Sequence, residues 1–326
     1  MEHIGIDVGG TKVSGAIFDD KNNIVTTETL YLEGRGGDDA TSLIFSLCDK
    51  LMCKLSSSTE SSKCTASIGS VHIGICIPGI AYSKTGRVWA PNIPKWDNYP
   101  LKEKFTARYP TFAITIESDR TCYILGEVSQ GAAKGCQNAI FLAVGTGIGA
   151  GILIDGRVLH GASDIVGATG WMALKPPYRS EWDERGCFES FCSGTGIALE
   201  ARKMVNDMAD AQNYSGILAA YPIEKISAKE VFAAHDQGDP IAKKVIENAI
   251  EMWGMATANF VSLFNPEMVI FGGGVFGPAT KFIDRIYNEA LKWAQPIAIK
   301  DCRFATTMLP DTAGLYGAGV IARQAL

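Results

Sequence analysis

The first stretch that could do chemistry lies near the start of the sequence, between apolar runs at residues 4–8 and 13–18. Its glycines and polar side chains are Asp7, Gly9, Gly10, Thr11 and Lys12. The pattern predicts a β-hairpin with the glycines at its tip, where backbone N–H groups can approach phosphate oxygens closely. Thr11 and Lys12 add donors, and Asp7 at the strand end suits an indirect hold on a hydrated Mg²⁺. The competing interpretation is an ordinary hairpin whose glycines only make the turn.

A second stretch repeats this design far along the sequence. Between residues 140 and 154, two apolar runs flank a tip made of Gly145, Thr146 and Gly147. Two such hairpins could face each other across a cleft and grip one nucleoside triphosphate. The single-loop pattern G-x-x-x-x-G-K-[ST] does not occur in the chain. A strand rather than a helix is expected after the second tip, which argues against a dinucleotide-binding turn.

The paired motifs resemble those of the sugar-kinase and actin-like ATPase superfamily, and within it the ROK family (repressor, open reading frame, kinase). Residues 7–12 match the first phosphate motif of that family and residues 145–149 match the second. The resemblance runs nearly end to end and implies an α/β protein. It implies two domains of the ribonuclease-H-like, actin-like ATPase type with an interdomain cleft. We expect an N-terminal domain over residues 1–120, joined by the C-terminal helix 312–326, and a C-terminal domain over 121–311.

The resemblance also assigns a sugar site to loops and strand ends. Gly79 follows a predicted buried strand at 71–77, and Asn92 lies in a loop rich in proline and tryptophan. Both match positions that border the sugar, although aromatics that merely pin the loop would explain its composition equally well. Asp119 follows the strand predicted at 112–117 and matches the catalytic aspartate, and Ser118, in place of the family's asparagine, is a further candidate to contact the sugar. A carboxylate there could accept the proton of an attacking sugar hydroxyl, whereas the ordinary role of such an aspartate is to cap the following helix.

The segment from residue 167 to residue 189 departs from the family pattern. Ala168 stands where a sugar-binding glutamate is expected, and Trp171 stands where a histidine would contact sugar and ligate zinc. Of the cysteine motif, only the final Gly-Cys-x-Glu survives, with Cys187 as its one matched cysteine. Because a structural zinc site needs about four nitrogen or sulfur ligands, we predict no structural zinc. Glu189 persists, and by the resemblance it is a candidate to accept hydrogen bonds from sugar hydroxyls.

The remaining elements are expected to position these residues. Residues 3–32 read as three consecutive strands, 41–55 as a helix with one apolar face, and 55–70 as an exposed loop. Ser227 and Glu230 predict a capping box, and Asp239 with Pro240 predicts the start of a long helix. A buried strand at 268–271 leads to Gly273 and Gly274, which by the resemblance lie beside the adenosine. A tight turn between strand and helix explains the same glycines.

Composition excludes several classes of function. The 326 residues carry a net charge of −5, which gives no global attraction to nucleic acid or to an anionic membrane. No apolar run reaches the length of a membrane span, and the first residues lack the pattern of a secretory signal. The nine cysteines are scattered, as buried free thiols are, which indicates a reducing cytoplasm. We expect a homodimer that binds neither nucleic acid nor membranes.

These observations lead to an ATP-dependent kinase that phosphorylates a hexose or hexosamine. Its cofactors would be ATP and Mg²⁺, and Asp119 would act as general base. The alternative is a non-catalytic, regulatory protein of the same family that binds sugar or nucleotide, because Ala168 and Trp171 remove two sugar contacts. The first phosphate motif begins at Asp7, so we expect no DNA-binding domain in front of it. The sequence does not identify the sugar.

Overall fold

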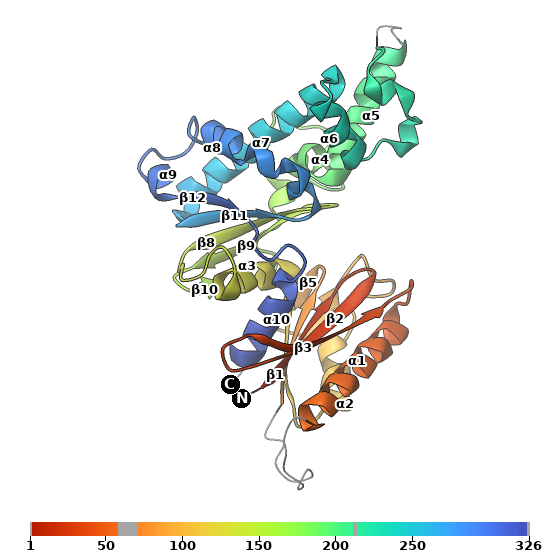
Figure 1. Ribbon diagram of the computed structural model, residues 1–326, viewed down its shortest axis with the longest axis vertical. Helices are drawn as coiled ribbons and strands as arrows, with labels where there is room; N and C mark the ends of the chain where they lie inside the picture. The colour runs from red at the N-terminus through yellow and green to blue at the C-terminus, as the bar shows by residue number, and fades with distance from the viewer. Residues whose placement is uncertain (1, 58–70, 211–213, 325–326) are drawn as a thin grey trace. The chain divides into compact units, whose positions relative to one another are not determined.

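The computed structural model describes residues 2–57, 71–210 and 214–324. It forms two compact units, which are described separately (Figure 1). The first contains residues 1–135, 158–166 and 308–326, and the second contains residues 136–157 and 167–307. Most of the loop expected at 55–70 lies outside the described residues, and the preceding helix runs on to Ser57. None of the described helices is both long enough and apolar enough to span a membrane.

The first unit is built on a five-stranded sheet in the order β3-β2-β1-β4-β7. The strands are β1 (His3–Val8), β2 (Lys12–Phe18), β3 (Ile24–Tyr31), β4 (His72–Ile77) and β7 (Ala113–Ser118). The first three pair antiparallel in sequence order, which confirms the prediction for residues 3–32. β4 runs parallel to both β1 and β7, so the C-terminal ends of these three strands meet at one edge. A small hairpin of β5 (Ile80–Tyr82) and β6 (Arg87–Trp89) follows β4.

Four helices cover the two faces of this sheet (Figure 1). They are α1 (Gly37–Ser57), α2 (Leu101–Arg108), α3 (Asp119–Gln130) and α10 (Ala313–Gln324). α1 and α2 share a core with alternate residues of β1 and β4, while α10 packs on the intervening positions. A side chain at Gly5 or Gly74 would strike the backbone of α10, so these two glycines let the helix lie close to the sheet.

The second unit also has a five-stranded sheet, in the order β10-β9-β8-β11-β12. The strands are β8 (Ala139–Val144), β9 (Ile148–Ile154), β10 (Arg157–Val158), β11 (Met268–Gly272) and β12 (Arg303–Thr306). β8 and β9 form the second predicted hairpin, and β8, β11 and β12 are parallel. The two units therefore share one strand plan, an antiparallel hairpin continued by parallel strands.

The longest helix of the second unit, α7, is buried along much of its length and contacts most of the other helices there. The helices are α4 (Cys187–Cys192), α5 (Gly194–Asp210), α6 (Ala228–Asp236), α7 (Pro240–Phe264), α8 (Ile283–Ala290) and α9 (Ala298–Asp301). Short 3₁₀ turns lie at Thr169–Trp171, Ser180–Trp182, Ile217–Ala220, Ile223–Lys225, Gly274–Phe276 and Pro278–Phe282. The capping box of Ser227 and Glu230 and the Asp239 cap are confirmed.

The compact units are divided differently from the expected domains, since residues 121–135, 158–166 and 308–311 lie in the first unit. Helix α3 belongs to the first unit rather than the second, because it packs along α10. The buried Glu127 of α3 strengthens this contact by accepting a hydrogen bond from Leu309 N at 3.1 Å. The segment 158–166 also joins the first unit, where His160 Nε2 lies 3.0 Å from Glu117 Oε1.

Candidate active site

The tip of the first hairpin is exposed and lies beside Asn92. One backbone hydrogen bond, from Gly9 N to Lys12 O at 2.9 Å, closes the tip. A side chain at Gly10 would come within 3.3 Å of Asn92 Cβ, so the predicted sugar-binding amide and the first phosphate motif are neighbours in this unit. Thr11 and Lys12 face solvent. The tip therefore offers exposed donors next to a side-chain amide.

Asp7 is a partly buried carboxylate at the end of β1. Burial raises its pKa, while a hydrogen bond from the Cys76 thiol and the charge of Lys12 act in the opposite direction. A side chain at Gly314, in the first turn of α10, would come within 2.7 Å of Asp7 Oδ2. No lysine or arginine in the described part of the chain forms an ion pair with it. An uncompensated carboxylate of this kind fits a hydrated divalent cation.

Asp119 is the first residue of α3 and lies at the same strand edge. Its Oδ1 accepts a hydrogen bond from Arg120 N at 2.8 Å, and the Gly79 amide also donates to it. Burial raises the pKa of Asp119 to about 6, against the opposing effect of the Arg120 charge, and Asp7 contributes to the rise. A carboxyl group with this pKa is largely ionised at neutral pH yet still able to take up a proton. The structure thus brings Asp7, Gly79 and Asp119 together.

Ser118, rather than Asp119, caps α3. Its Oγ accepts from Thr121 N at 3.4 Å and donates to Thr121 Oγ1 at 3.2 Å, and the residue is buried. The ordinary capping role considered for Asp119 therefore falls to its neighbour, which leaves the Asp119 carboxylate available for chemistry. Because the Ser118 hydroxyl is already engaged, its part in substrate binding stays a prediction.

The tip of the second hairpin contacts Glu189. Glu189 Oε2 accepts a hydrogen bond from Ile148 N at 2.7 Å, directly after Gly147. Burial raises the pKa of Glu189, and the bond from Ile148 opposes the rise. Trp171, at the position of the family's histidine, is 57% exposed, and the adjacent Gly170 packs against the Glu189 side chain. The structure therefore brings Gly147, Glu189 and the turn at Gly170 and Trp171, where the sequence departs from the family pattern, together within the second unit.

Three predicted nucleotide-binding residues line one cavity of about 930 Å³ beside the second hairpin tip. They are Gly145, Thr146 and Gly274, and the opposite walls come from α5, α6 and the turn after β11. Gly273 precedes this turn with a φ of +87°, and a side chain there would lie 2.5 Å from Val144 O, so only glycine fits. A partly apolar cavity of this volume is large enough for a nucleoside. Its other lining residues, including Thr195, Arg202 and Phe232, carry no motif by which the sequence could have revealed them.

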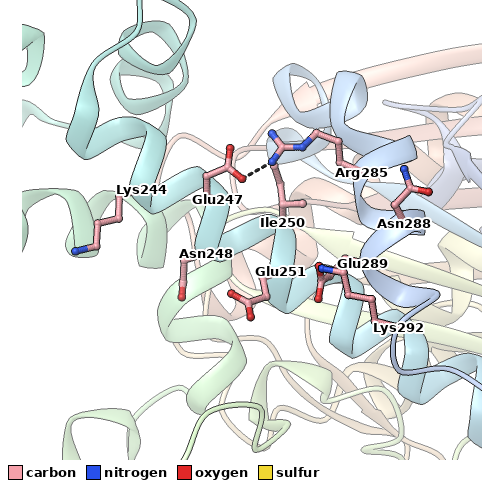
Figure 2. A pocket seen from close by; sticks show the side chains of 9 residues that line it. All are labelled: Lys244, Glu247, Asn248, Ile250, Glu251, Arg285, Asn288, Glu289 and Lys292. Carbon is pink, nitrogen blue, oxygen red and sulfur yellow. Dashed lines mark hydrogen bonds and ion pairs between the residues drawn. The ribbon is translucent and has the colours of Figure 1, made fainter.

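A second hollow, of about 690 Å³, lies between α7 and α8 (Figure 2). Four of its charged residues form two ion pairs, Arg285 with Glu247 and Lys292 with Glu289, and Lys244 and Glu251 line it as well. No residue predicted to bind substrate or cofactor lines it. It is a groove of paired surface charges and offers no convergent chemistry.

The segment that would hold the family's zinc is packed by aromatic side chains instead. Trp182, at the position of a cysteine, is buried with its ring 5.7 Å from that of Phe191. Ser180 occupies the other lost cysteine position, and indole and hydroxyl groups are not zinc ligands of such sites. No three histidine, cysteine or acidic side chains gather as a metal site within the described ranges. These residues do not fit a structural zinc ion.

The fold and these two glycine hairpins define the class. Each unit carries a five-stranded sheet that begins with an antiparallel hairpin, and the whole is the two-domain, actin-like ATPase fold of sugar kinases. The ROK family model matches residues 3–325, and the chain belongs to the ROK family.

The relatives of the chain include sugar kinases of two kinds. It is 28% identical to a glucokinase of Halalkalibacterium halodurans, over 99% of this chain and 95% of that one. It is 26% identical to an N-acetyl-D-glucosamine kinase of Escherichia coli, over 98% of each chain. A crystal structure of a ROK family glucokinase from Streptomyces griseus, in complex with glucose and AMPPNP, has 26% identity and a TM-score of 0.73. That comparison covers 99% of this chain and 100% of the other.

Proposed function

We propose that the protein is an ATP-dependent sugar kinase that transfers the γ-phosphoryl group to a hydroxyl of a hexose or hexosamine, with Asp119 as general base. The observation that carries this proposal is the state of Asp119, a partly buried carboxylate at a strand end with a pKa raised to about 6. The curated relatives, which are glucokinases and N-acetylglucosamine kinases, support the class of reaction.

In this mechanism, Asp119 accepts the proton of the sugar hydroxyl as the hydroxyl oxygen attacks the γ-phosphorus of ATP and ADP leaves. The amides of Arg120 and Gly79 hold the carboxylate in one orientation. Above a pH of about 6 the carboxylate is charged and ready to accept, and the proton leaves to solvent after transfer. Catalysis of phosphoryl transfer otherwise depends on positioning and on charge stabilisation.

The nucleotide would be held by the residues of the two phosphate motifs and the turn after β11. Gly9, Gly10, Thr11 and Lys12 offer exposed donors for phosphate oxygens. Gly145, Thr146, Gly147, Gly273 and Gly274 form or border the cavity that would take the nucleoside. Asp7 would hold Mg²⁺ through water, because its carboxylate ends β1 without an ion-pair partner in the described part of the chain. When bound, that cation neutralises charge on the transferring phosphates.

The sugar would contact Gly79, Asn92, Ser118, Asp119 and Glu189. Ala168 and Trp171 stand where the family has polar residues. The Ala168 side chain accepts no hydrogen bond, and Trp171 has a large aromatic face with one N–H donor. A site that loses hydrogen-bonding groups becomes less demanding at the corresponding hydroxyls. We therefore expect weak activity on glucose and better activity on a modified hexose or a hexosamine. We also propose that the protein works in a reducing cytoplasm, since every cysteine in the described ranges is a free thiol. The homodimer expected from the sequence stays a proposal.

Calorimetry against a panel of sugars, with and without a non-hydrolysable ATP analogue, tests the proposal, followed by an ADP-release assay on the best ligand. Binding of one sugar together with turnover supports the kinase. Nucleotide binding without any sugar binding would instead favour the non-catalytic, regulatory protein, which the changes at Ala168 and Trp171 make the second candidate. Strong, selective phosphorylation of glucose would show that these two residues do not line the sugar pocket.

A further inference from the structure

One short piece of chain, the junction between α4 and α5, holds the second hairpin tip at both of its ends. At the start of the tip, Gly145 O accepts a hydrogen bond from Gly194 N at 2.7 Å. At its end, Ile148 N donates to Glu189 Oε2 at 2.7 Å. Glu189 and Gly194 are five residues apart, so one helix-to-helix junction fixes the tip from two sides. The conformation of the tip is therefore tied to the position of a single carboxylate.

The carboxylate of Glu189 packs against two glycines, one on each side. A side chain at Gly147 would come within 2.8 Å of Glu189 Oε2, and one at Gly170 would come within 2.9 Å of the same atom. The carboxylate is thus wedged between the hairpin tip and the turn that carries Trp171. Its second oxygen, Oε1, accepts no hydrogen bond from the residues that the structure describes. One oxygen is committed to the phosphate hairpin, and the other is open to a donor from a ligand.

We infer that Glu189 is a positioning residue that couples sugar binding to nucleotide binding. This inference rests on the proposed function, in which a sugar hydroxyl donates to Oε1. Such a bond would fix the carboxylate, and through Ile148 it would order the tip that meets the phosphates. By linkage, the nucleotide must then strengthen sugar binding by the same factor. Coupling of this kind typically changes affinity by about 5–150-fold.

The test measures the affinity of AMP-PNP in the wild type and in three variants, each with and without the best sugar. Glu189→Ala removes both contacts. AMP-PNP alone should then bind roughly tenfold more weakly, as expected when a hydrogen bond to a charged group is lost, and the sugar should have no further effect. Glu189→Gln keeps a carbonyl oxygen that can still hold Ile148 N, but it places an NH2 donor where Oε1 would accept from a sugar hydroxyl. This variant should bind AMP-PNP alone nearly as the wild type does, yet lose most of the coupling.

The matched control is Glu184→Gln, five residues earlier, whose side chain is 87% exposed. It should leave both the affinity and the coupling unchanged. Hydrogen–deuterium exchange over residues 144–150 supplies a readout independent of ligands. Glu189→Ala should speed exchange at the tip, while Glu189→Gln should not. If Glu189→Ala fails to fold, the split between nucleotide affinity and coupling in Glu189→Gln decides the matter.

Different failures point to different conclusions. If the Glu189 variants weaken only sugar binding and leave AMP-PNP affinity and tip exchange unchanged, Glu189 is a sugar contact and the inference is overturned. If the wild type binds nucleotide but no sugar, the kinase proposal fails. The coupling then fails with it, while the exchange measurement still reports on the anchoring of the tip. Wild-type protein that binds neither ligand would overturn both.

Discussion

Replacement of Asp119 by asparagine should abolish turnover and, at the same time, make the folded protein more stable. The carboxylate is partly buried at the N-terminus of α3, and burial is the largest cause of its raised pKa. Folding therefore works against its charged form, which the uncharged amide does not have. A catalytic carboxylate often lowers the stability of the fold in this way, because its pKa is shifted to suit proton transfer.

The size of the stability gain follows from the pKa. Folding raises the pKa of Asp119 from 3.8 to about 6, and a shift of that size corresponds to about 3 kcal/mol. The cost is present in full above pH 6, because there the carboxylate is charged in both the folded and the unfolded chain. It fades as the pH falls through 6 towards 3.8 and vanishes below that range, where both states are protonated. Asparagine keeps only one good acceptor for the amides of Arg120 and Gly79, so we expect a gain of roughly 1–3 kcal/mol at pH 8.

Two assays read this prediction. Urea unfolding of the wild type and Asp119→Asn at pH 8 and again near pH 4 should show the gain only at the higher pH. Turnover on the best sugar should fall by ~10²–10⁴-fold, the usual contribution of a general base. In the wild type, kcat/KM should be about tenfold lower at pH 5 than at pH 7, since the fraction of ionised Asp119 in the ligand-free protein changes by that factor around a pKa of about 6. Arg120→Gln should move this acid limb to higher pH, because the Arg120 charge lowers the Asp119 pKa.

Each half of the reasoning can be refuted separately. Unchanged turnover in Asp119→Asn would place the base elsewhere. If the variant is less stable than the wild type at pH 8, or equally stabilised at pH 4, burial does not destabilise the charged form of this carboxylate. If turnover is lost with no gain in stability, Asp119 is still the general base, but the claim that burial destabilises its charged form is refuted.

Two further predictions concern the metal and the packing of the first unit. Elemental analysis of purified, untagged protein should find well under one zinc per chain, and a chelator should not shift thermal unfolding, because Trp182 occupies a cysteine position and is buried; one tightly held zinc would contradict this. Glu127→Ala should destabilise the protein by about 3 kcal/mol in urea unfolding, because it leaves the amides of Ala132 and Leu309 without their buried acceptor. Glu127→Gln should cost less, and a loss below about 1 kcal/mol in the alanine variant would refute this role.

Local patterns in the sequence predicted the local structure well. Apolar runs broken by glycines gave both hairpins, and Ser227 and Asp239 marked helix starts that the structure confirms. These signals depend on the nearest few residues, whose conformational preferences change little with the rest of the fold. The family resemblance extended this to the whole fold, since the family model spans residues 3–325.

Long-range contacts were beyond the reach of the sequence. The cap of α3 is Ser118 rather than Asp119, because the Ser118 hydroxyl is the one that accepts the hydrogen bond from Thr121 N. Helix α3 packs closely on α10 across almost two hundred residues of chain, a contact that no local signal near residue 120 predicts. The bond between Ile148 and Glu189 joins residues that no short motif connects. In each case tertiary packing decided between local alternatives that the sequence leaves equal.

The departures from the family pattern gather in the segment that leads to Glu189, and the packing there explains how the residue could keep its position without zinc. Helix α4, which carries Glu189, is anchored by the buried rings of Phe188 and Phe191. Trp182 packs edge-on against Phe191, which joins the preceding turn to the helix. An aromatic cluster of this kind can fix a short helix as a metal site would, through burial rather than coordination. Loss of the zinc ligands is therefore compatible with a working second hairpin, provided that this apolar anchor holds α4 and its carboxylate in place.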